Sequence, residues 1–396
     1  MISPPQLAAM AHAYGVSVAR LRAARRYLYG GLFWGTLAQL WLLAVLAHLA
    51  FRGCGVRGRD WLRARVGEGW RLYLVFSAGL LALLELALLP WDFGIGFLRE
   101  SLYGFERLSL AGWLLDWLKS ALIGIAAGAL LALLFAFLAR RFPRRWWLAA
   151  WALVVAFMLA GAVIEPIWIE PLFNRFTPVK NVQLRRLIRQ EAVRAGVPHA
   201  AIYQVNRGRQ SSHTNAYVIG LLGSQRIVVY NTLLREYPPP EVRFIVAHEL
   251  GHYVLHHLWL GLAFGAAWLL PLFWLGAWIF HRAARRPRFS APGASLPAAD
   301  PAALPLLLFL LAALLWLSTP AFNGFSRWEE HQADAFALRL DPHPAAGIAA
   351  FKRFVRTDLS YPAPPPWVVW WFYNHPSLQQ RVGFIARQAR ASGKRP

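Results

Sequence analysis

Cysteine and acidic residues are scarce in this chain, and each shortage excludes a class of protein. The 396 residues contain one cysteine, Cys54, which excludes an intrachain disulfide framework and a zinc finger built on cysteines. Aspartate and glutamate number 19 against 42 lysines and arginines, so the formal net charge is +23. Only 15% of the residues are charged and 57% are hydrophobic, which excludes a disordered or collagen-like chain. Any metal site must therefore use histidine, aspartate and glutamate.

Long hydrophobic runs make up much of what is present. The hydrocarbon core of a bilayer requires about 20 apolar residues in a helix, and nearly uncharged runs of that order occur six times. The predicted membrane spans are 31–51, 72–89, 120–139, 146–164, 258–280 and 302–322. Arginines flank most of these runs, so we expect much of the positive charge at the membrane surface and no nucleic-acid partner. The sequence thus predicts a mainly α, polytopic helical bundle in the lipid bilayer.

Two polar blocks lie outside the spans. An N-terminal membrane domain at 1–168 precedes the first block, 169–257, and a transmembrane hairpin at 258–322 separates it from the second block, 323–396. The first block predicts one helix and three short strands, at 184–195, 201–205, 216–219 and 226–230. A proline-rich stretch at 361–367 predicts a loop. Neither block is large enough to form an enzyme alone, so we expect the two to fold together as a small α+β domain.

The segment His248-Glu249-Leu250-Gly251-His252 carries the strongest chemical signal. On a helix, His248 and His252 are about one turn apart and share a face, so both imidazoles can bind one Zn²⁺. Glu249 lies beside them and can accept a proton from an attacking water. The alternative is a helix whose histidines merely face water. The apolar neighbours of the motif disfavour it, because an idle charge is costly at an apolar boundary.

A zinc ion in an enzyme needs a third protein ligand and an open position for water. The hairpin at 258–322 returns the chain to the same membrane face, and Glu329, Glu330 and His331 follow soon after. All three are chemically possible ligands. Glu330 is favoured because Asp334, four residues on, shares its helix face and can orient a zinc-bound histidine. The alternative interpretation is the solvated start of an acidic helix.

Further motifs occur in a fixed order along the chain beyond residue 90. They are Trp113, Asp116 and Lys119; Pro171-Leu172-Phe173-Asn174 with Phe176 and Pro178; Ser211-Ser212-His213-Thr214-Asn215-Ala216-Tyr217; Arg226-Ile227-Val228 with Thr232-Leu233-Leu234; Asn323, Ser326, Arg327, Glu330, Ala333 and Asp334; and His375-Pro376-Ser377 with Arg381. Together with the zinc motif, this order resembles the type I CaaX prenyl proteases. These are integral membrane zinc metallopeptidases of peptidase family M48, and the heat-shock protease HtpX is a more distant relative.

The resemblance implies a zincin-like metalloprotease domain with one Zn²⁺ per chain. It implies that Glu330 is the third ligand and that Glu249 is the catalytic base. It also implies that His375 and Arg381 line the site. A donor besides the metal is needed for the oxyanion that develops during hydrolysis, and His375 is the candidate. The other interpretation of His375 is a surface histidine before a proline.

The resemblance also concerns residues around the metal and the substrate. It implies that Asn215, Ala216 and Tyr217 belong to an edge strand that pairs with the backbone of an extended peptide. The other interpretation of this strand is an internal hairpin with no ligand. Asp334 and Arg327 are expected to contact and orient the metal ligands without binding the metal themselves.

The predicted activity is hydrolysis of peptide bonds in a peptide or protein substrate, membrane-associated or lipidated as in the CaaX proteases. A membrane quality-control endopeptidase like HtpX is an alternative that uses the same residues in a looser groove. A non-catalytic, zinc-stabilised membrane scaffold is another, but metal binding alone does not need Glu249. Two features depart from the family. Asn231 stands where aspartate is usual, and we count six spans where the eukaryotic members have seven.

Arginine counts and the resemblance disagree about which membrane face carries the active site. Short segments hold six arginines on the catalytic face and fourteen on the opposite face. The positive-inside rule therefore places the site outside the cytoplasm. The CaaX proteases act from the cytoplasmic side, and the rule weakens where long polar segments flank the spans. Because the bias towards arginine, alanine and leucine indicates a bacterial source, we expect a bacterial cytoplasmic membrane protein with its active site on the cytoplasmic face.

Overall fold

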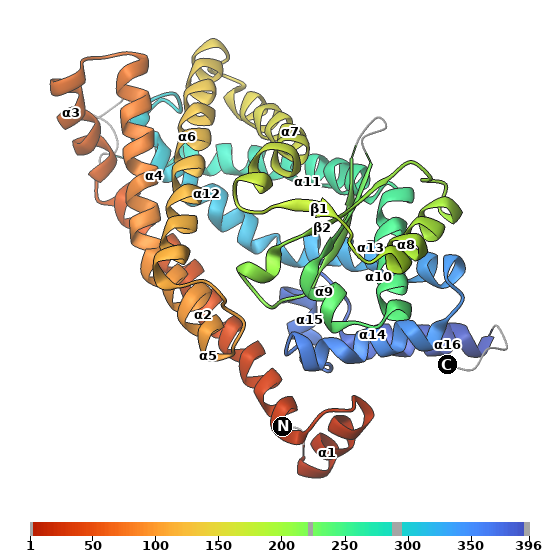
Figure 1. Cartoon of the computed structure of the whole chain (residues 1–396). Coiled ribbons are helices and arrows are strands. Elements are labelled where there is room, and N and C mark those ends of the chain that lie inside the picture. Colours follow the sequence, from red (N-terminus) through yellow and green to blue (C-terminus); the bar gives the residue numbers. More distant parts are fainter. Residues whose placement is uncertain (1–2, 221–224, 287–294, 392–396) are drawn as a thin grey trace.

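The computed structural model describes residues 3–220, 225–286 and 295–391, and Figure 1 shows a bundle of long helices joined to a part that contains one small sheet. The α-helices are α1 (Pro4–Ala13), α2 (Val18–Phe51), α3 (Cys54–Val66), α4 (Trp70–Asp92), α5 (Glu100–Leu102), α6 (Leu110–Arg141), α7 (Trp146–Ile164), α8 (Val182–Arg194), α9 (Asn231–Glu236), α10 (Pro239–Val254), α11 (His257–Ala283), α12 (Leu304–Leu317), α13 (Thr319–Leu340), α14 (Pro344–Thr357), α15 (Pro366–Phe372) and α16 (Leu378–Ala391). The strands are β1 (Phe176–Pro178), β2 (Ala201–Val205), β3 (Ala216–Ile219) and β4 (Arg226–Tyr230).

Five helical segments among the described residues are long and apolar enough to cross a membrane. They are Val18–Phe51, Trp70–Leu102, Leu110–Arg141, Trp146–Leu172 and His257–Ala283. A sixth is reached if α12 and α13 count as one bent span. The chain is therefore an integral membrane protein with five or six helical spans, as the apolar runs predicted.

The sixth predicted span, 302–322, is wrong as a single straight helix. Helices α12 and α13 meet at Ser318 with a bend of 47°. Pro320 occupies the first turn of α13. It has no N–H for the helical hydrogen bond, and its ring clashes with the preceding turn, so a continuous helix would be disrupted here. The bend turns α13 out of the bundle and carries Glu330 towards the part of the chain that contains the sheet. We call this the catalytic part, because it contains the predicted zinc motif.

The spans form a closed ring of neighbours. Helix α2 packs on α4, α4 on α6, α6 on α7, α7 on α11, α11 on α12, and α12 again on α2. At one crossing, a Cβ on Gly128 of α6 would lie 2.8 Å from the side chain of Leu81 on α4, so glycine permits this close approach. Five of the six helices, all except α2, line an apolar cavity of about 230 Å³. The ring provides a fixed base for the catalytic helices.

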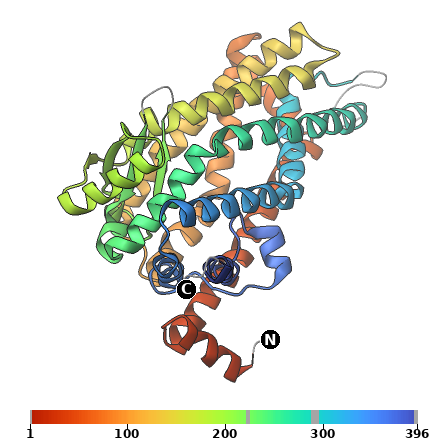
Figure 2. The same ribbon diagram turned by 90° about the vertical axis from the view of Figure 1, so that its right-hand side faces the viewer.

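Helix α2 begins at Val18, well before the predicted start of the first span at 31. Its N-terminal turns carry Leu21 and Ala24, both fully buried, in one cluster with Val355 and Leu359 of the C-terminal block. Figure 2 shows this end of α2, in red, beside the blue helices α14 and α16. The polar residues of this stretch are unsuited to the bilayer. Its apolar face packs against the C-terminal block of the same chain. The first span is thereby anchored to the catalytic part.

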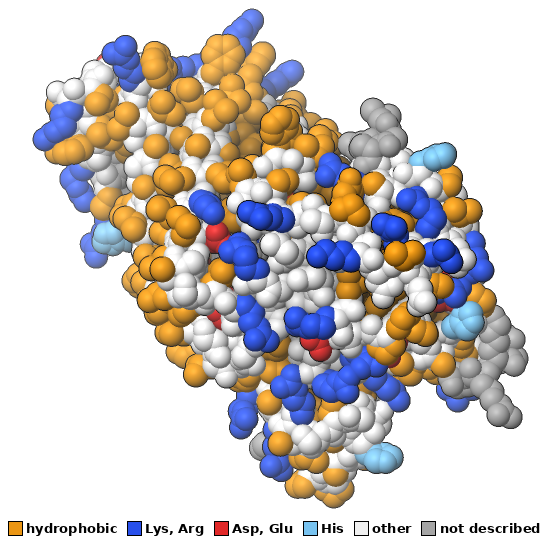
Figure 3. Space-filling view, viewed as in Figure 1, with side chains coloured by type: hydrophobic (Ala, Val, Ile, Leu, Met, Phe, Trp, Pro, Cys, Tyr) orange, Lys and Arg blue, Asp and Glu red, His pale blue; other side chains and the backbone are white. Residues whose placement is uncertain are grey.

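Large apolar side chains stay exposed along the spans. Leu86, Phe137 and Trp168 are 62%, 67% and 70% exposed. Figure 3 shows hydrophobic side chains over the end of the molecule that contains α4, α6 and α7, and Lys and Arg side chains gather beyond it. Such a surface suits contact with lipid tails, and the cations suit the headgroup region.

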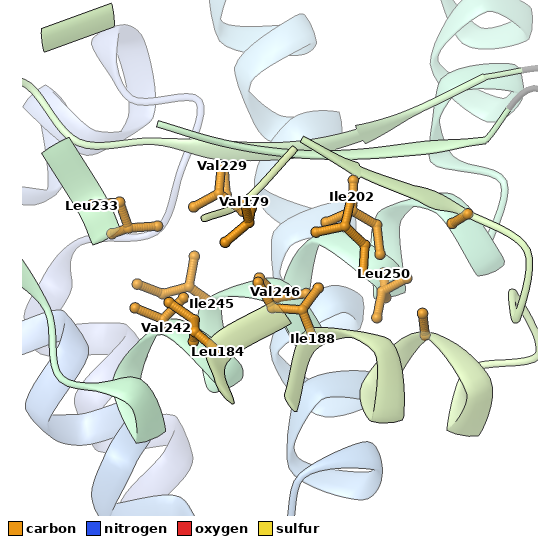
Figure 4. Packing of buried hydrophobic residues seen from close by; sticks show 14 of the residues in the cluster. Val179, Leu184, Ile188, Ile202, Val229, Leu233, Val242, Ile245, Val246 and Leu250 are labelled. Carbon is orange, nitrogen blue, oxygen red and sulfur yellow. The ribbon is translucent and has the colours of Figure 1, made fainter. Parts of the chain in front are cut away.

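The catalytic part is built on a four-stranded sheet of order β1-β2-β4-β3. The three predicted strands match β2, β3 and β4, and the predicted helix matches α8 within two residues. The short strand β1 was not predicted, nor was the parallel pairing of β2 with β4. Helices α8 and α10 pack on one face of the sheet, and Figure 4 shows Ile188 of α8 and Val246 of α10 below Ile202 and Val229. Helix α10 is therefore fixed under the edge strand β3.

Two further elements do not follow the predicted boundaries. The predicted loop at 361–367 ends early, because Pro366 begins helix α15, where its missing N–H is no loss. Helix α13 runs across the boundary placed between 322 and 323. The division into 1–168, 169–257, 258–322 and 323–396 stays a prediction.

Candidate active site

Helices α10 and α13 pack against each other along the zinc motif, and a glycine permits their approach. A Cβ on Gly251 would lie 3.1 Å from the side chain of Phe336 and 3.2 Å from the Cα of Ala333. Val242, Ile245 and Val246 on the other side of α10 pack into the core under the sheet. With one face held by the sheet, α10 presents its histidines to α13.

His248, His252 and Glu330 form what we call the metal cluster. One ligand atom from each lies within 4.8 Å of the others. The two Nε2 atoms are 3.1 Å apart, while Nε2 of His248 lies 3.3 Å from Oε2 of Glu330 and Nε2 of His252 lies 3.2 Å from Oε1. Two imidazole nitrogens and a carboxylate that converge in this way fit the donor set of a catalytic zinc site.

Glu329 and His331, the other possible ligands, lie elsewhere. The Glu329 carboxylate is near Gly261 of α11, where a Cβ would be 3.8 Å from Oε1. The ring of His331 packs against Phe384 with centroids 5.5 Å apart. Glu330 is the member of this trio that faces α10.

A buried ion-pair network surrounds the metal cluster. Nδ1 of His248 lies 3.0 Å from Oδ1 of Asp334, so the carboxylate can fix the orientation of the imidazole. Arg381 of α16 donates to both Asp334 oxygens, at 2.6 and 3.0 Å, and its Nη1 lies 3.3 Å from Glu330. Asp334 and Arg381 are buried. The arginine thus balances the charge of two carboxylates beside the candidate ligands.

His257 also contacts the metal cluster, and the sequence analysis gave it no role. Its Nδ1 lies 2.9 Å from Nδ1 of His252. The chain reaches this position through a tight turn in which His256 has a φ of 59°. The buried His257 ring thereby orients the second imidazole, as Asp334 orients the first. A histidine five residues after the motif was the available signal, but the turn that directs it inward was not predictable from spacing.

Glu249 and His375 face the same cavity, which has a volume of about 570 Å³. Burial raises the pKa of the Glu249 carboxyl, and the neighbouring imidazoles of His248 and His252 oppose that rise. Nε2 of His375 lies 3.1 Å from Oε1 of Glu330, and half of this side chain is exposed. A carboxyl group and an imidazole therefore line the cavity beside the metal cluster.

Arg327, which we expected to support the metal ligands, makes its hydrogen bonds to the chain segment before His375. Its guanidinium donates to the carbonyl oxygens of Val369 and Tyr373, at 2.9 and 2.5 Å. Both carbonyls belong to the C-terminal part of α15 and its cap, shortly before His375. Arg327 therefore fixes the loop that presents His375, and it influences the site through that loop.

The predicted substrate strand lies at the edge of the sheet. β3 pairs with β4 on one side only and has the terminal place in the strand order. Asn215 and Ala216 line the catalytic cavity. Tyr217 points elsewhere, since its hydroxyl donates to Glu170 at 2.5 Å. The structure brings the first two residues to the cavity and separates the third side chain from it.

A second cluster, the His213 cluster, contains Glu100, His213 and Asp358 and was not predicted. Nε2 of His213 lies 3.0 Å from Glu100 and Nδ1 lies 3.1 Å from Asp358. Burial lowers the pKa of His213, but the two carboxylates outweigh it and raise the value to about 9. His213 and Asp358 also line the catalytic cavity. The cluster joins three segments that lie far apart in sequence.

Comparisons with known proteins agree with this geometry. The profile of peptidase family M48 matches residues 178–389, and that of the CAAX prenyl protease N-terminal region, described as five membrane helices, matches residues 9–175. The described residues up to 175 supply four candidate spans, α2, α4, α6 and α7. This is one span fewer than the description of that profile gives.

Individual relatives cover most of the chain. A Bacillus subtilis protein named uncharacterized metalloprotease YhfN is 33% identical over 87% of this chain and 80% of its own length. CAAX prenyl protease 1 of Saccharomyces cerevisiae is 29% identical over 78% of this chain and 71% of its own. The crystal structure of S. mikatae Ste24p shares the fold, with a TM-score of 0.80 and 24% identity over 94% of this chain and 89% of that one. This chain therefore belongs to peptidase family M48 and is a membrane metalloprotease similar to the CAAX prenyl proteases.

Proposed function

We propose that this metalloprotease is a zinc-dependent endopeptidase in which His248, His252 and Glu330 hold one Zn²⁺. The convergence of these three side chains between α10 and α13 is the observation that carries the proposal. Zinc in such a site supplies a Lewis acid for the scissile carbonyl and makes water nucleophilic at neutral pH. Asp334, His257 and Arg381 orient the ligands and balance their charge.

Glu249 and His375 carry the proton and charge changes of the reaction. Glu249 accepts the proton of the attacking water and then gives it to the leaving amine. His375 donates a hydrogen bond to the oxygen that gains negative charge, which it can do because half of its side chain remains exposed to the cavity.

The substrate is proposed to be an extended peptide on β3, close to the membrane. An incoming chain can add to the free edge of this four-residue strand through backbone hydrogen bonds, which demand little of the substrate sequence. Leu28 and Leu32 of the first span form an apolar wall of the same cavity. That wall and the name of the yeast relative support a membrane-anchored or lipidated protein as substrate.

A pair of peptides tests activity and substrate together. The peptides share one sequence, and one carries an isoprenyl group. The purified protein should cleave both, and cleave the lipidated peptide with the higher kcat/KM. A chelator should abolish cleavage, and zinc should restore it. Equal kcat/KM for both peptides would support the HtpX-like alternative and would contradict the lipidated substrate. Chelator-resistant cleavage would contradict the zinc proposal.

The active site is proposed to face the cytoplasm. The resemblance to the CaaX proteases supports this face, and the arginine distribution opposes it. Lys180 is exposed at the start of the catalytic part, so Lys180→Cys in a Cys54→Ala background reports its location. The thiol should resist a membrane-impermeant maleimide in intact cells and react after lysis. Labelling in intact cells would place the active site on the outer face.

A further inference from the structure

A polar hollow lies where the fourth span meets the sheet. Its volume is about 410 Å³, and it shares no lining residue with the catalytic cavity. One wall is the stretch 171–175 after α7, and the other contains Asn206 and Arg209, which follow β2. The backbone N–H of Arg175 donates to Asn206 at 2.7 Å, and Arg209 donates to the carbonyl of Phe173 at 2.9 Å. The two walls are therefore fixed relative to one another.

Asn174 in this lining has a buried amide without a partner. Its side chain is 4% exposed, and neither Nδ2 nor Oδ1 has a hydrogen-bond partner among the described residues. Buried polar atoms in folded proteins are nearly always paired, since an unpaired one loses its hydration without compensation. The amide needs a partner as small as a water molecule, because its polar atoms have almost no accessible surface. The case for a larger ligand therefore depends on the charged and apolar groups around the hollow.

The charge around the hollow favours an anion. Arg175 is exposed, and its contacts to Asn206 use only backbone atoms, which leaves the guanidinium available at the rim. Arg209 is half exposed, and Lys119 lies 5.8 Å from the ring of Phe173. Asp116 opposes them, 3.7 Å from Arg209 and 3.2 Å from Lys119. Three cations against one carboxylate leave a net positive charge.

The hollow lies at the membrane surface. The span Trp146–Leu172 ends in its lining. Leu172 and Trp168 on this last part of the span are 55% and 70% exposed. Exposed tryptophan is typical of the headgroup level, where one side of the ring meets lipid tails. An apolar surface for acyl chains therefore continues directly into a cationic hollow.

We propose that this hollow binds the phosphate of an anionic phospholipid. The guanidiniums of Arg175 and Arg209 pair with the phosphate oxygens. The acyl chains lie along Trp168 and Leu172. Lipid is chosen over free phosphate because only a lipid also covers that apolar surface. The site is independent of the catalytic residues, so its test needs no activity.

Native mass spectrometry of the full-length protein in detergent tests the proposal. The protein is titrated with phosphatidylglycerol or with phosphatidylcholine of the same acyl chains. Phosphatidylglycerol should bind more tightly, because its phosphate is not balanced by a cation. Arg175→Gln should weaken its binding about fivefold, the effect of one arginine near an anionic lipid surface. Arg175→Glu should weaken it further, because it places a carboxylate beside the phosphate.

Arg186→Gln and Arg186→Glu are the matched controls, because Arg186 is an exposed arginine on α8 outside the hollow. They should bind phosphatidylglycerol as the unchanged protein does. Arg175→Gln should keep the melting temperature, since its side chain is exposed, so a loss of binding cannot be ascribed to misfolding. Equal binding by the Arg175→Glu and Arg186→Glu variants would overturn the proposal. Equal binding of the two lipids, or displacement of phosphatidylglycerol by inorganic phosphate, would overturn it too.

Discussion

Two clusters of histidine and carboxylate side chains border the catalytic cavity, which His248 lines from one cluster and His213 and Asp358 line from the other. The atoms within each cluster face one another differently. In the metal cluster, two histidine Nε2 atoms lie 3.1 Å apart and share the oxygens of one glutamate. In the His213 cluster, each ring nitrogen faces a carboxylate of its own. The first arrangement directs several lone pairs to one point, which suits a cation. The second alternates donors and acceptors, which suits a protonated imidazole.

Residue type therefore does not decide what such a cluster holds. His213 has two carboxylate neighbours within 3.1 Å, as many acidic partners as His248 has in Glu330 and Asp334. The two clusters differ because different secondary-structure elements supply their side chains. Two helices with a glycine between them bring side chains to one point, whereas three separate segments surround His213 from opposite sides. We therefore expect metal chemistry at the metal cluster and structural, proton-dependent behaviour at the His213 cluster.

The largest expected effect separates catalysis from metal binding. Glu249→Gln removes the base but none of the three ligands, so kcat should fall by about 10²- to 10⁴-fold while zinc content stays near one per chain. Peptide cleavage and elemental analysis of the same preparation measure both. Substantial activity in the metal-loaded variant would contradict the role of Glu249.

The next effect concerns His375, at the open side of the metal cluster. His375→Ala should lower kcat about a hundredfold and leave KM nearly unchanged, because the donor acts on charge that develops during the reaction. His375→Gln retains a donor and should recover part of the rate. A rise in KM with an unchanged kcat would show that His375 binds substrate instead.

Removal of a side chain that orients a metal ligand should have a smaller effect. Asp334→Asn should lower zinc affinity about 10- to 100-fold, since it loses the charged partner of His248 and of Arg381. Competition with a fluorescent chelator measures the affinity. Asp341→Asn is the control, because Asp341 is an equally buried carboxylate that pairs with His343 and Arg243 outside the metal cluster. Similar losses in both variants would mean a general loss of stability.

The smallest effect is a pH dependence of stability at the His213 cluster. The pKa of His213 is raised in the folded protein from 6.5 to about 9. Its contribution should be complete below about 6.5 and should be lost as the pH rises through about 9. The melting temperature of the unchanged protein should fall across this window more than that of His213→Gln. If the melting temperatures of the two proteins fell in parallel with pH, protonation of His213 would not contribute to stability.

The sequence predicted the parts that depend on local patterns. The strands β2, β3 and β4 have their predicted bounds because β-branched runs and turns are local signals. The i, i+4 spacing placed His248 and His252 on one face of α10, and the return of the chain through a membrane hairpin led to the trio Glu329, Glu330 and His331. The spacing to Asp334 and the family resemblance then favoured Glu330, the member that lies beside the two histidines.

The missed features depend on contacts that periodicity does not contain. Apolar residues continue across Ser318, so the bend at Pro320 was hidden in a run that looked like one span. The inward direction of His257 follows from the positive φ of His256. Glu100, His213 and Asp358 are more than 100 residues from one another. Long-range contacts bring their segments together, such as the bridge between Glu106 and Ser211 and the packing of Phe105 with Leu359 in one cluster.

The zinc content of purified variants tests the central comparison most directly. Elemental analysis should find about one zinc per chain in the unchanged protein, in Glu329→Ala and His331→Ala, and in His213→Gln. Glu330→Ala should contain almost none, because it loses one of three converging ligands. Zinc retained by Glu330→Ala, or lost from His213→Gln while that variant stays folded, would contradict the assignment of the metal to one cluster and the proton to the other.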